Sequence, residues 1–292
     1  MMPGMPLRPD LHELNRRSWD AATRAHNSHK RDQARFLRQG GTTLFSEELE
    51  LLGDLDGKRL LHLCCNSGQD TLSLAGRHGA TVTGVDISEE AISFARALSA
   101  ESGIAARFER ADVYDWLCEA PARDERYDAV YFSYGAICWL SDLDMLFAGS
   151  GAVLAEGGRV VVLEYHPVLG LFDREWRLRH PYSMDGASEV IAWEPGVSDY
   201  VAEARGALSP SGHEEGVVGF VNPHPAFEFN HGLGAIATAI ARAGLLIECM
   251  REYPYSNGFT FGAMRPLAGN RFAPPEGFPA LPLMYGLRIE RR

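Results

Sequence analysis

A strand, a turn of small residues, a helix and a second strand follow one another within residues 59–88, and this order constrains the fold more than any other feature. The apolar run Leu60–Leu63 predicts a buried parallel strand. A turn of small residues over 64–68 leads into a helical pattern, and the second strand, Thr81–Asp86, ends in an acid. Such a turn lets backbone approach a ligand, and the acid can accept hydrogen bonds from ribose hydroxyls. Because Asp86 follows Gly68 at close to the roughly 20 residues expected for that acid, the pattern predicts a doubly wound sheet that holds a nucleoside.

The same segment resembles motif I of the class I S-adenosylmethionine-dependent methyltransferases. That motif usually has an acid at the end of the strand and then a Gly-x-Gly-x-Gly turn. Here His62 stands at the acid position, Cys64 and Asn66 stand at the first two glycines, and Gly68 is kept. The longer stretch LHLCCNSGQDTLSLA resembles a variant in bacterial small-molecule methyltransferases, written roughly LHLQCNFGQDTLSLAR. The resemblance extends from about Asn15 to Arg288 and implies S-adenosylmethionine as cofactor.

The resemblance also assigns residues to the cofactor. Asp86 is expected to bind the ribose diol, with Ile87 against the adenine, while Gln69 is expected to reach the methionine carboxylate. Asp112 matches the acid that binds the adenine amino group, and Val113 would supply a backbone N–H. Structural roles remain as alternatives, because Asp often caps helices and aromatic residues often fill cores. The complete set of expected cofactor contacts is Trp19, Cys64, Asn66, Gly68, Gln69, Asp86, Ile87, Asp112, Val113 and Ser133.

Three residues are catalytic candidates. Pro167 favours an extended conformation at His166, which is predicted to face the transferring methyl group as a general base or an orienting group. His231 is the competing candidate, and it follows Asn230, which is a good helix N-cap. Tyr134 follows the fourth strand, at the edge where doubly wound sheets bind ligands. For both histidines, a purely structural role is the alternative.

Alternating strand and helix patterns predict an α/β fold with a Rossmann-like, doubly wound, seven-stranded sheet. The resemblance implies that the last two strands form a terminal antiparallel hairpin. The expected strands are Arg59–Cys64, Thr81–Asp86, Ala106–Arg110, Tyr127–Ser133, Arg159–Tyr165, Leu245–Glu252 and Leu283–Ile289.

The chain is predicted to divide into three parts. Residues 1–50 form an N-terminal helical segment that closes over the cofactor, with a helix over 10–27 that Asp10 could cap. Residues 51–166 and 231–292 form the methyltransferase core. The alternation of strand and helix patterns stops over residues 167–230. This segment is rich in aromatic residues and is interpreted as a substrate cap inserted after the fifth strand. Period-two runs predict short strands in the cap at Glu189–Trp193 and Asp199–Ala204.

Composition limits the partners and the compartment. The net charge of −11 argues against a nucleic-acid partner, which would need a basic face. The five cysteines show no C-x-x-C spacing, so neither a metal site nor a disulfide framework is expected. With no signal-peptide pattern and no apolar run of spanning length, we expect a cytoplasmic protein without a membrane partner. The oligomeric state stays open, and a homodimer is one candidate.

These observations predict methyl transfer from S-adenosylmethionine to a small acceptor, aromatic or heterocyclic, at oxygen, nitrogen or carbon. An enclosed aromatic segment suits a flat ligand. Two other classes remain. An NAD(P)-dependent oxidoreductase would share the strand, turn and acid but normally shows a fuller Gly-x-Gly-x-x-Gly turn. A non-catalytic protein that binds S-adenosylmethionine is the other alternative.

Overall fold

One seven-stranded sheet organises the chain, of which the computed structural model describes residues 6–183 and 190–291. Its strands are β1 (Arg59–Leu63), β2 (Thr81–Asp86), β3 (Arg107–Arg110), β4 (Tyr127–Phe132), β5 (Leu154–Tyr165), β8 (Leu245–Tyr253) and β12 (Met284–Arg291). They lie in the order β3-β2-β1-β4-β5-β12-β8, parallel from β3 to β5 and antiparallel at β12. The predicted fold and its terminal antiparallel hairpin are therefore confirmed. The strand order reverses between β1 and β4, which is where such sheets bind ligands.

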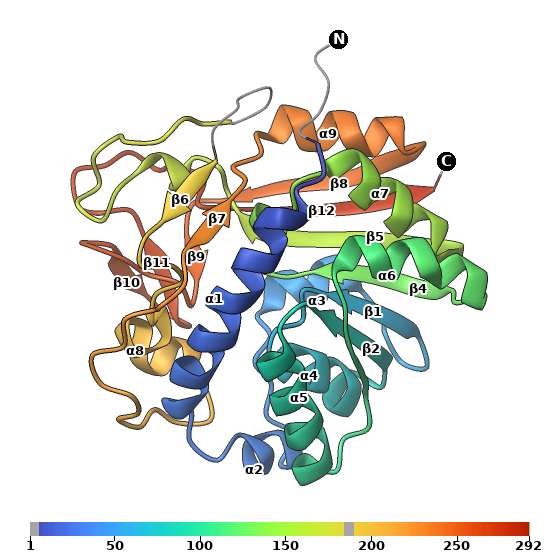
Figure 1. The fold of residues 1–292 in the computed structure, drawn as a ribbon, viewed down its shortest axis with the longest axis horizontal. Coiled ribbons are helices and arrows are strands. Elements are labelled where there is room, and N and C mark those ends of the chain that lie inside the picture. Colours follow the sequence, from blue (N-terminus) through green and yellow to red (C-terminus); the bar gives the residue numbers. More distant parts are fainter. Residues whose placement is uncertain (1–5, 184–189, 292) are drawn as a thin grey trace.

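Helices cover both faces of this sheet (Figure 1). On one face lie α6 (Val113–Glu119), α7 (Leu143–Ala152) and α9 (Leu233–Arg242). The other face is covered by α3 (Ser46–Leu52), α4 (Gln69–His78) and α5 (Glu89–Ser102). Short 3₁₀ turns complete the connections at η1 (Ala120–Arg123), η2 (Ile137–Trp139), η3 (Leu169–Leu171) and η4 (Arg205–Leu208).

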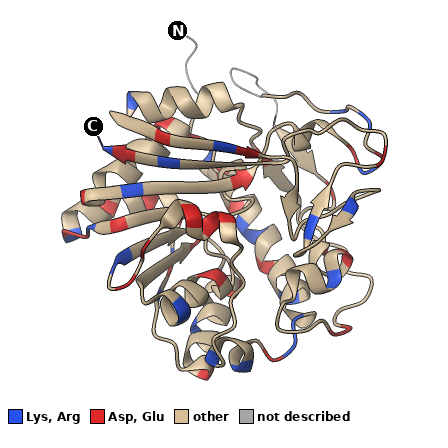
Figure 2. Cartoon of the chain, turned by 180° about the vertical axis from the view of Figure 1, so that it is seen from behind, with Lys and Arg blue, Asp and Glu red and all other residues tan. Residues whose placement is uncertain are grey.

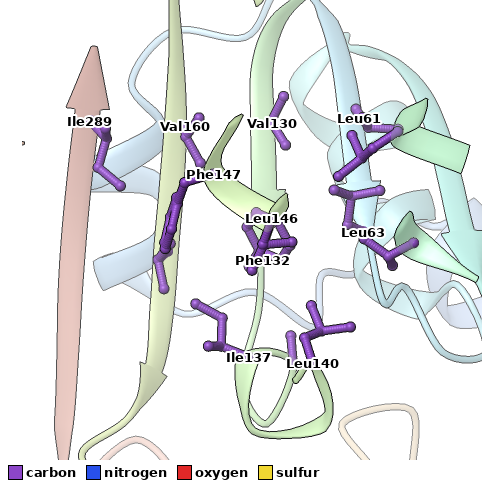
Figure 3. Packing of buried hydrophobic residues seen from close by; sticks show 14 of the residues in the cluster. Leu61, Leu63, Val130, Phe132, Ile137, Leu140, Leu146, Phe147, Val160 and Ile289 are labelled. Carbon is purple, nitrogen blue, oxygen red and sulfur yellow. The ribbon is translucent and has the colours of Figure 1, made fainter. Parts of the chain in front are cut away.

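Buried apolar residues fix the strands between these two helical layers. Figure 3 shows the layer between the sheet and α7, where Leu61 of β1 and Val160 of β5 belong to one buried cluster with Phe147 of α7. Successive strand residues point to opposite faces, so Leu60 and Val161 belong to the other layer. Because both faces are covered, β1 and β5 read as continuous apolar runs rather than as alternating patterns.

The N-terminal helix α1 (Pro9–Ser28) lies between the sheet and the cap, and α2 (Gln33–Arg38) follows it (Figure 1). The prediction that Asp10 caps α1 is wrong: Arg8 occupies the N-cap without a side-chain cap, and Pro9 begins the helix. Proline suits this position because its fixed φ angle is already helical and its missing N–H would have no partner there. On its inner side, Asn15 donates to the Phe227 carbonyl at 2.9 Å and accepts from the Phe227 N–H at 2.7 Å.

Two chain segments lie beside the carboxyl edge of the sheet (Figure 1): the predicted cap after β5 and the connection between β8 and β12, together called the cap segments. From the first segment, β6 (Ile191–Trp193) pairs with β7 (Ala226–Glu228). The second segment forms a separate sheet from β9 (Ser256–Asn257), β10 (Arg265–Leu267) and β11 (Arg271–Ala273). Apolar contacts of Leu169 and Trp176 with Met264 and Leu283 join the two segments.

One strand prediction in the cap is wrong. Residues 200–204 form the helix α8 (Tyr200–Ala204), because the Asp199 side chain accepts from the Ala202 N–H and caps a helical turn. The other predicted strand, Glu189–Trp193, is present as β6, and Glu189 at its start lies outside the described residues.

Gly68 provides a test of the turn between β1 and α4. It has a φ of 76°, and a Cβ there would lie 2.8 Å from the Ala95 Cβ and from the Phe108 ring. Gly68→Ala should therefore lower the free energy of unfolding by about 2–4 kcal/mol, from the left-handed backbone and the overpacking together. Gly103→Ala is the control, since its φ is 74° with no atom within 4 Å of the added Cβ. Urea unfolding should show a smaller loss there, of about 1–2 kcal/mol, and equal losses would contradict this account.

Candidate active site

The carboxyl ends of the parallel strands open into a cavity of about 1090 Å³. Its wall is built from α1, the turn after β1, the ends of the central strands and both cap segments. Except for Gly68, every residue predicted for the site lines this cavity: Trp19, Cys64, Asn66, Gln69, Asp86, Ile87, Asp112, Val113, Ser133, Tyr134, His166 and His231. The structure therefore brings the predicted residues together. Gly68 does not line the cavity, but its positive φ shapes the turn whose neighbouring residues do.

The turn after β1 keeps a backbone shape that glycine favours, although two of its glycine positions hold other residues. Cys64 has a φ of 56°, Asn66 of 48° and Gly68 of 76°. Asparagine adopts this left-handed region more readily than most residues, whereas cysteine is strained there. The turn therefore keeps the backbone conformation expected of the glycine motif, and the side chains of Cys64 and Asn66 line the cavity.

Asp86 joins this turn to the end of β2. Its Oδ2 accepts from the Asn66 N–H at 2.8 Å, and its Oδ1 accepts from the Ser88 N–H at 2.9 Å. Burial raises the pKa of Asp86 to about 6, although the N–H donors oppose the shift. A carboxylate has about four acceptor positions, so each oxygen can still accept a further hydrogen bond from a ligand hydroxyl.

Asp112 follows β3 and has two partners in the protein. Its Oδ1 accepts from the Tyr114 N–H at 2.8 Å and caps α6, which is the structural role considered as the alternative. Its Oδ2 accepts from His12 Nδ1 at 2.9 Å. We did not predict His12, and its sequence signal is weak: it lies three and seven residues before Asn15 and Trp19, on the same face of α1.

His62, at the position of the family acid, holds three elements together. It is fully buried in β1 and hydrogen-bonds to Thr71 of α4 at 2.9 Å and to Ser133 after β4 at 3.0 Å. Burial lowers its pKa to about 3, so the imidazole is neutral at cellular pH. The Ser133 hydroxyl is thereby engaged by His62.

Glu164 at the end of β5 holds the turn after β4. Oε1 accepts from the N–H groups of Gly135 and Tyr165, while Oε2 accepts from those of Ala136 and Ile137, all at 2.5–2.9 Å. Burial raises the pKa of Glu164 to about 7, and the four N–H groups oppose this shift. The backbone beside Tyr134 is thus fixed by one buried carboxyl group.

Comparison with known proteins agrees with this arrangement. The family profile described as "Methyltransferase domain" matches residues 60–158. A demethylmenaquinone methyltransferase of Thermus thermophilus is 34% identical over 149 residues, which are 50% of this chain and 66% of that protein. One of Tropheryma whipplei is 26% identical over 158 residues, which are 53% of this chain and 62% of that protein. A solved S-adenosylmethionine-dependent methyltransferase from Mesorhizobium loti has a TM-score of 0.52 at 19% identity, covering 83% of this chain and 94% of that one.

The chain contains a methyltransferase domain and has the fold of the class I S-adenosylmethionine-dependent methyltransferases. Its resemblance to this family and the expected cofactor are confirmed. The chain spans about three fifths to two thirds of the length of these curated relatives.

Both ring nitrogens of His166 are engaged by the protein. Nδ1 accepts from the Val168 N–H at 3.1 Å, so the proton lies on Nε2, which donates to Glu252 at 2.9 Å. Burial lowers the pKa of His166. This geometry favours an orienting role over that of a general base.

The other catalytic candidates also have protein partners. His231 donates from Nε2 to the Leu140 carbonyl at 2.8 Å, and the Tyr134 hydroxyl accepts from the Asn257 side chain at 2.9 Å. The expected Asn230 cap is wrong: Gly232 is the N-cap of α9, and the Asn230 amide instead donates to the Pro181 carbonyl.

Glu228, at the end of β7, is a cavity residue that the sequence analysis missed. The Trp193 side chain hydrogen-bonds to it, and burial raises its pKa to about 7. Backbone hydrogen bonds fix its neighbours, since the Phe229 N–H donates to the Cys138 carbonyl at 2.7 Å. Its one sequence signal is a carboxylate placed between aromatic residues in the stretch AFEFN.

Within residues 6–183 and 190–291, no group of three or more His, Cys, Asp or Glu side chains is placed to hold a metal ion. Over the same residues, no helix combines the length and the apolar character needed to cross a bilayer.

The raised pKa of Asp86 predicts how cofactor binding depends on pH. As the pH falls through 6, Asp86 gains a proton and loses the charge that favours hydrogen bonds from ribose hydroxyls. The affinity for S-adenosylhomocysteine should therefore fall between pH 7 and 5. Asp86→Asn should weaken binding at pH 8 by roughly 1–3 kcal/mol and remove this dependence. Calorimetric titration measures both effects, with the exposed Asp115→Asn as control. An affinity that stays constant from pH 8 to 5 would rule out this role.

Proposed function

We propose that this methyltransferase transfers the methyl group of S-adenosylmethionine to a small, flat acceptor that binds between the cofactor and the cap. One observation carries the proposal: a single cavity is lined both by the strand-end acids Asp86 and Asp112 and by aromatic residues of the cap. Its volume of about 1090 Å³ is slightly above the range of pockets for one drug-sized ligand. It therefore has room for a cofactor and an acceptor together.

The cofactor would lie over the switch point of the sheet. Asp86 would accept hydrogen bonds from the ribose diol, and Ile87 and Val113 would flank the adenine. Asp112 keeps acceptor capacity for the adenine amino group, although His12 and the Tyr114 N–H already donate to it. Trp19, Cys64, Asn66 and Ser133 would form the remaining contacts.

S-adenosylmethionine supplies a methyl group already activated on a sulfonium. The protein must hold the acceptor atom, the methyl carbon and the sulfur nearly in line and exclude water. Trp19 meets Trp139 edge to face, with ring centroids 5.5 Å apart, and Tyr165 lies 5.0 Å from Phe259. These rings line the cavity, where they exclude water and can face a cation.

An aromatic or heterocyclic acceptor, a quinone ring included, fits this wall. The names of the curated relatives, demethylmenaquinone methyltransferases, support an acceptor of that kind. In the view of Figure 2, Lys and Arg are scattered among acidic residues rather than gathered on one surface, which suits a small molecule better than a nucleic acid. The cytoplasmic location and a homodimer stay predictions.

A protonated acceptor also needs a base, and Glu228 is better placed for that role than the histidines. Its carboxylate lies in the cavity wall, and among the described residues its donor is the neutral Trp193 side chain. By contrast, His166 and His231 each direct a ring N–H at a protein acceptor. We therefore assign orientation of the acceptor to His166, His231 and Tyr134, and proton removal to Glu228.

Titration calorimetry and methyl transfer together test the function. We expect S-adenosylmethionine and S-adenosylhomocysteine to bind and NAD(H) not to bind. Transfer of a radiolabelled methyl group to a panel of quinols, phenols and heterocyclic amines should then identify the acceptor. Binding of NAD(H) in place of S-adenosylmethionine would favour the oxidoreductase alternative. Cofactor binding without transfer to any compound or to a cell extract would favour the non-catalytic one.

Glu228→Gln tests the base. For a hydroxyl acceptor, we expect the variant to lower kcat by roughly 10²–10⁴-fold without changing the affinity for S-adenosylhomocysteine. The wild-type rate should rise as the pH increases through about 7, where Glu228 loses its proton, and the variant should lack this rise. Glu194→Gln, which changes an exposed carboxylate on the same cavity wall, is the matched control. His166→Asn should cause a smaller loss that depends weakly on pH; the opposite ranking of the Glu228 and His166 variants would return the base role to His166.

A further inference from the structure

We propose that Lys30 binds the α-carboxylate of S-adenosylmethionine and so determines where the amino-acid end of the cofactor lies in the cavity. The inference rests on the proposed function only for the identity of the cofactor. It does not depend on which acceptor is methylated.

The cavity wall is strongly acidic. The described lining residues with carboxyl groups are Asp70, Asp86, Asp112, Glu164, Asp173, Glu175, Glu194, Glu203 and Glu228. The described lining residues with an ammonium or guanidinium group are Lys30 and Arg174. Arg174 already donates to Glu203 at 2.9 Å, and its side chain is 59% exposed. Lys30 is therefore the cation of this wall that remains available to an anionic group of a ligand.

The Lys30 ammonium has no hydrogen-bonded partner. Across residues 6–183 and 190–291 it forms no hydrogen bond, and the charge it interacts with is the buried carboxyl group of Asp70, whose pKa is raised by burial. Burial lowers the pKa of Lys30 to about 8. A desolvated ammonium without a partner is costly, and proteins normally pair such groups. A ligand anion would supply the missing partner.

Backbone contacts fix the position of Lys30 directly after α1. Lys30 forms an antiparallel bridge with His213 of the cap segment, and the Arg31 N–H donates to the Gly212 carbonyl at 2.8 Å. The ammonium is thus held near the start of α4, since Asp70 is the second residue of that helix. Gly68 is the N-cap there and gives no side-chain cap. The first N–H groups of α4 therefore add a positive partial charge beside Lys30.

Gln69, which was expected to reach the carboxylate, has its donors engaged elsewhere. Its Nε2 donates to Asn27 Oδ1 at 2.9 Å and to Gln33 Oε1 at 2.7 Å. Lys30 supplies a charged side-chain donor at this end of the cavity.

Charge also limits how the cofactor can be oriented. S-adenosylmethionine carries an ammonium, a sulfonium and a single carboxylate. The carboxylate is stabilised beside Lys30 and would be repelled by Glu164 or Glu228 on the rest of the wall. With the carboxylate at Lys30 and the ribose at Asp86, the sulfonium lies between them, where the aromatic and acidic wall suits a cation.

Calorimetry with two ligands tests the proposal without an acceptor. The ligands are S-adenosylhomocysteine and its decarboxylated analogue, in which hydrogen replaces the carboxylate. We expect the wild-type chain to prefer S-adenosylhomocysteine by roughly 10–100-fold, the effect of one charge-assisted hydrogen bond. Lys30→Met should bind both ligands alike. Lys58→Met is the control, because the only other lysine is exposed and lies at the opposite end of β1, and it should keep the wild-type preference.

The outcomes separate this proposal from the function itself. If the wild-type chain binds neither ligand, the proposed function fails. If it binds both but Lys30→Met keeps the full preference, the role of Lys30 is overturned. Thermal unfolding of the ligand-free variants should show no loss of stability in Lys30→Met, whereas a structural Lys30–Asp70 pair would make that variant less stable.

A second measurement needs no variant. Acetylation of the wild-type chain, followed by mass spectrometry, reports separately on Lys30 and Lys58. S-adenosylhomocysteine should protect Lys30 strongly and its decarboxylated analogue should protect it weakly, with Lys58 unaffected by either. Equal protection of Lys30 by the two ligands at saturation would contradict contact with the carboxylate.

Discussion

The candidate site depends on the hydrogen bond from the Asn66 N–H to Asp86, which fixes the turn after β1 against the end of β2. The turn passes through three residues with positive φ, and two of them, Cys64 and Asn66, are not glycine. Such a backbone persists only where its surroundings hold it. Asp86 provides that restraint from one side, and the packing of Gly68 against Ala95 and Phe108 provides it from behind.

Neutral and partly neutralised groups connect the remaining strand ends. A neutral His62 joins β1 to α4 and to Ser133, in a place where the family usually has an acid. Glu164 joins β5 to the turn after β4 through four N–H groups. Because these groups find their partners inside the protein, the hydrogen bonds at the edge of the sheet do not depend on a ligand. Such preorganisation favours a reaction that depends mainly on alignment.

The sequence predicted what is local in the chain. The seven strands follow from runs of apolar residues, and Asp86 was found because an acid at a strand end is a pattern within one segment. The features that were missed depend on distant pairings. Lys30 is held by residues 212–213, and β9 pairs with β11 across a loop. The helix α8 shows a third reason, since a single cap by Asp199 outweighed a period-two pattern.

Helix α1 joins the two sides of the cavity. Toward the cap, Asn15 forms two hydrogen bonds with the Phe227 backbone. Toward the sheet, His12 binds Asp112, which follows β3. Because Trp19 lines the cavity from the same helix, the position of α1 sets the cofactor wall and the acceptor wall together.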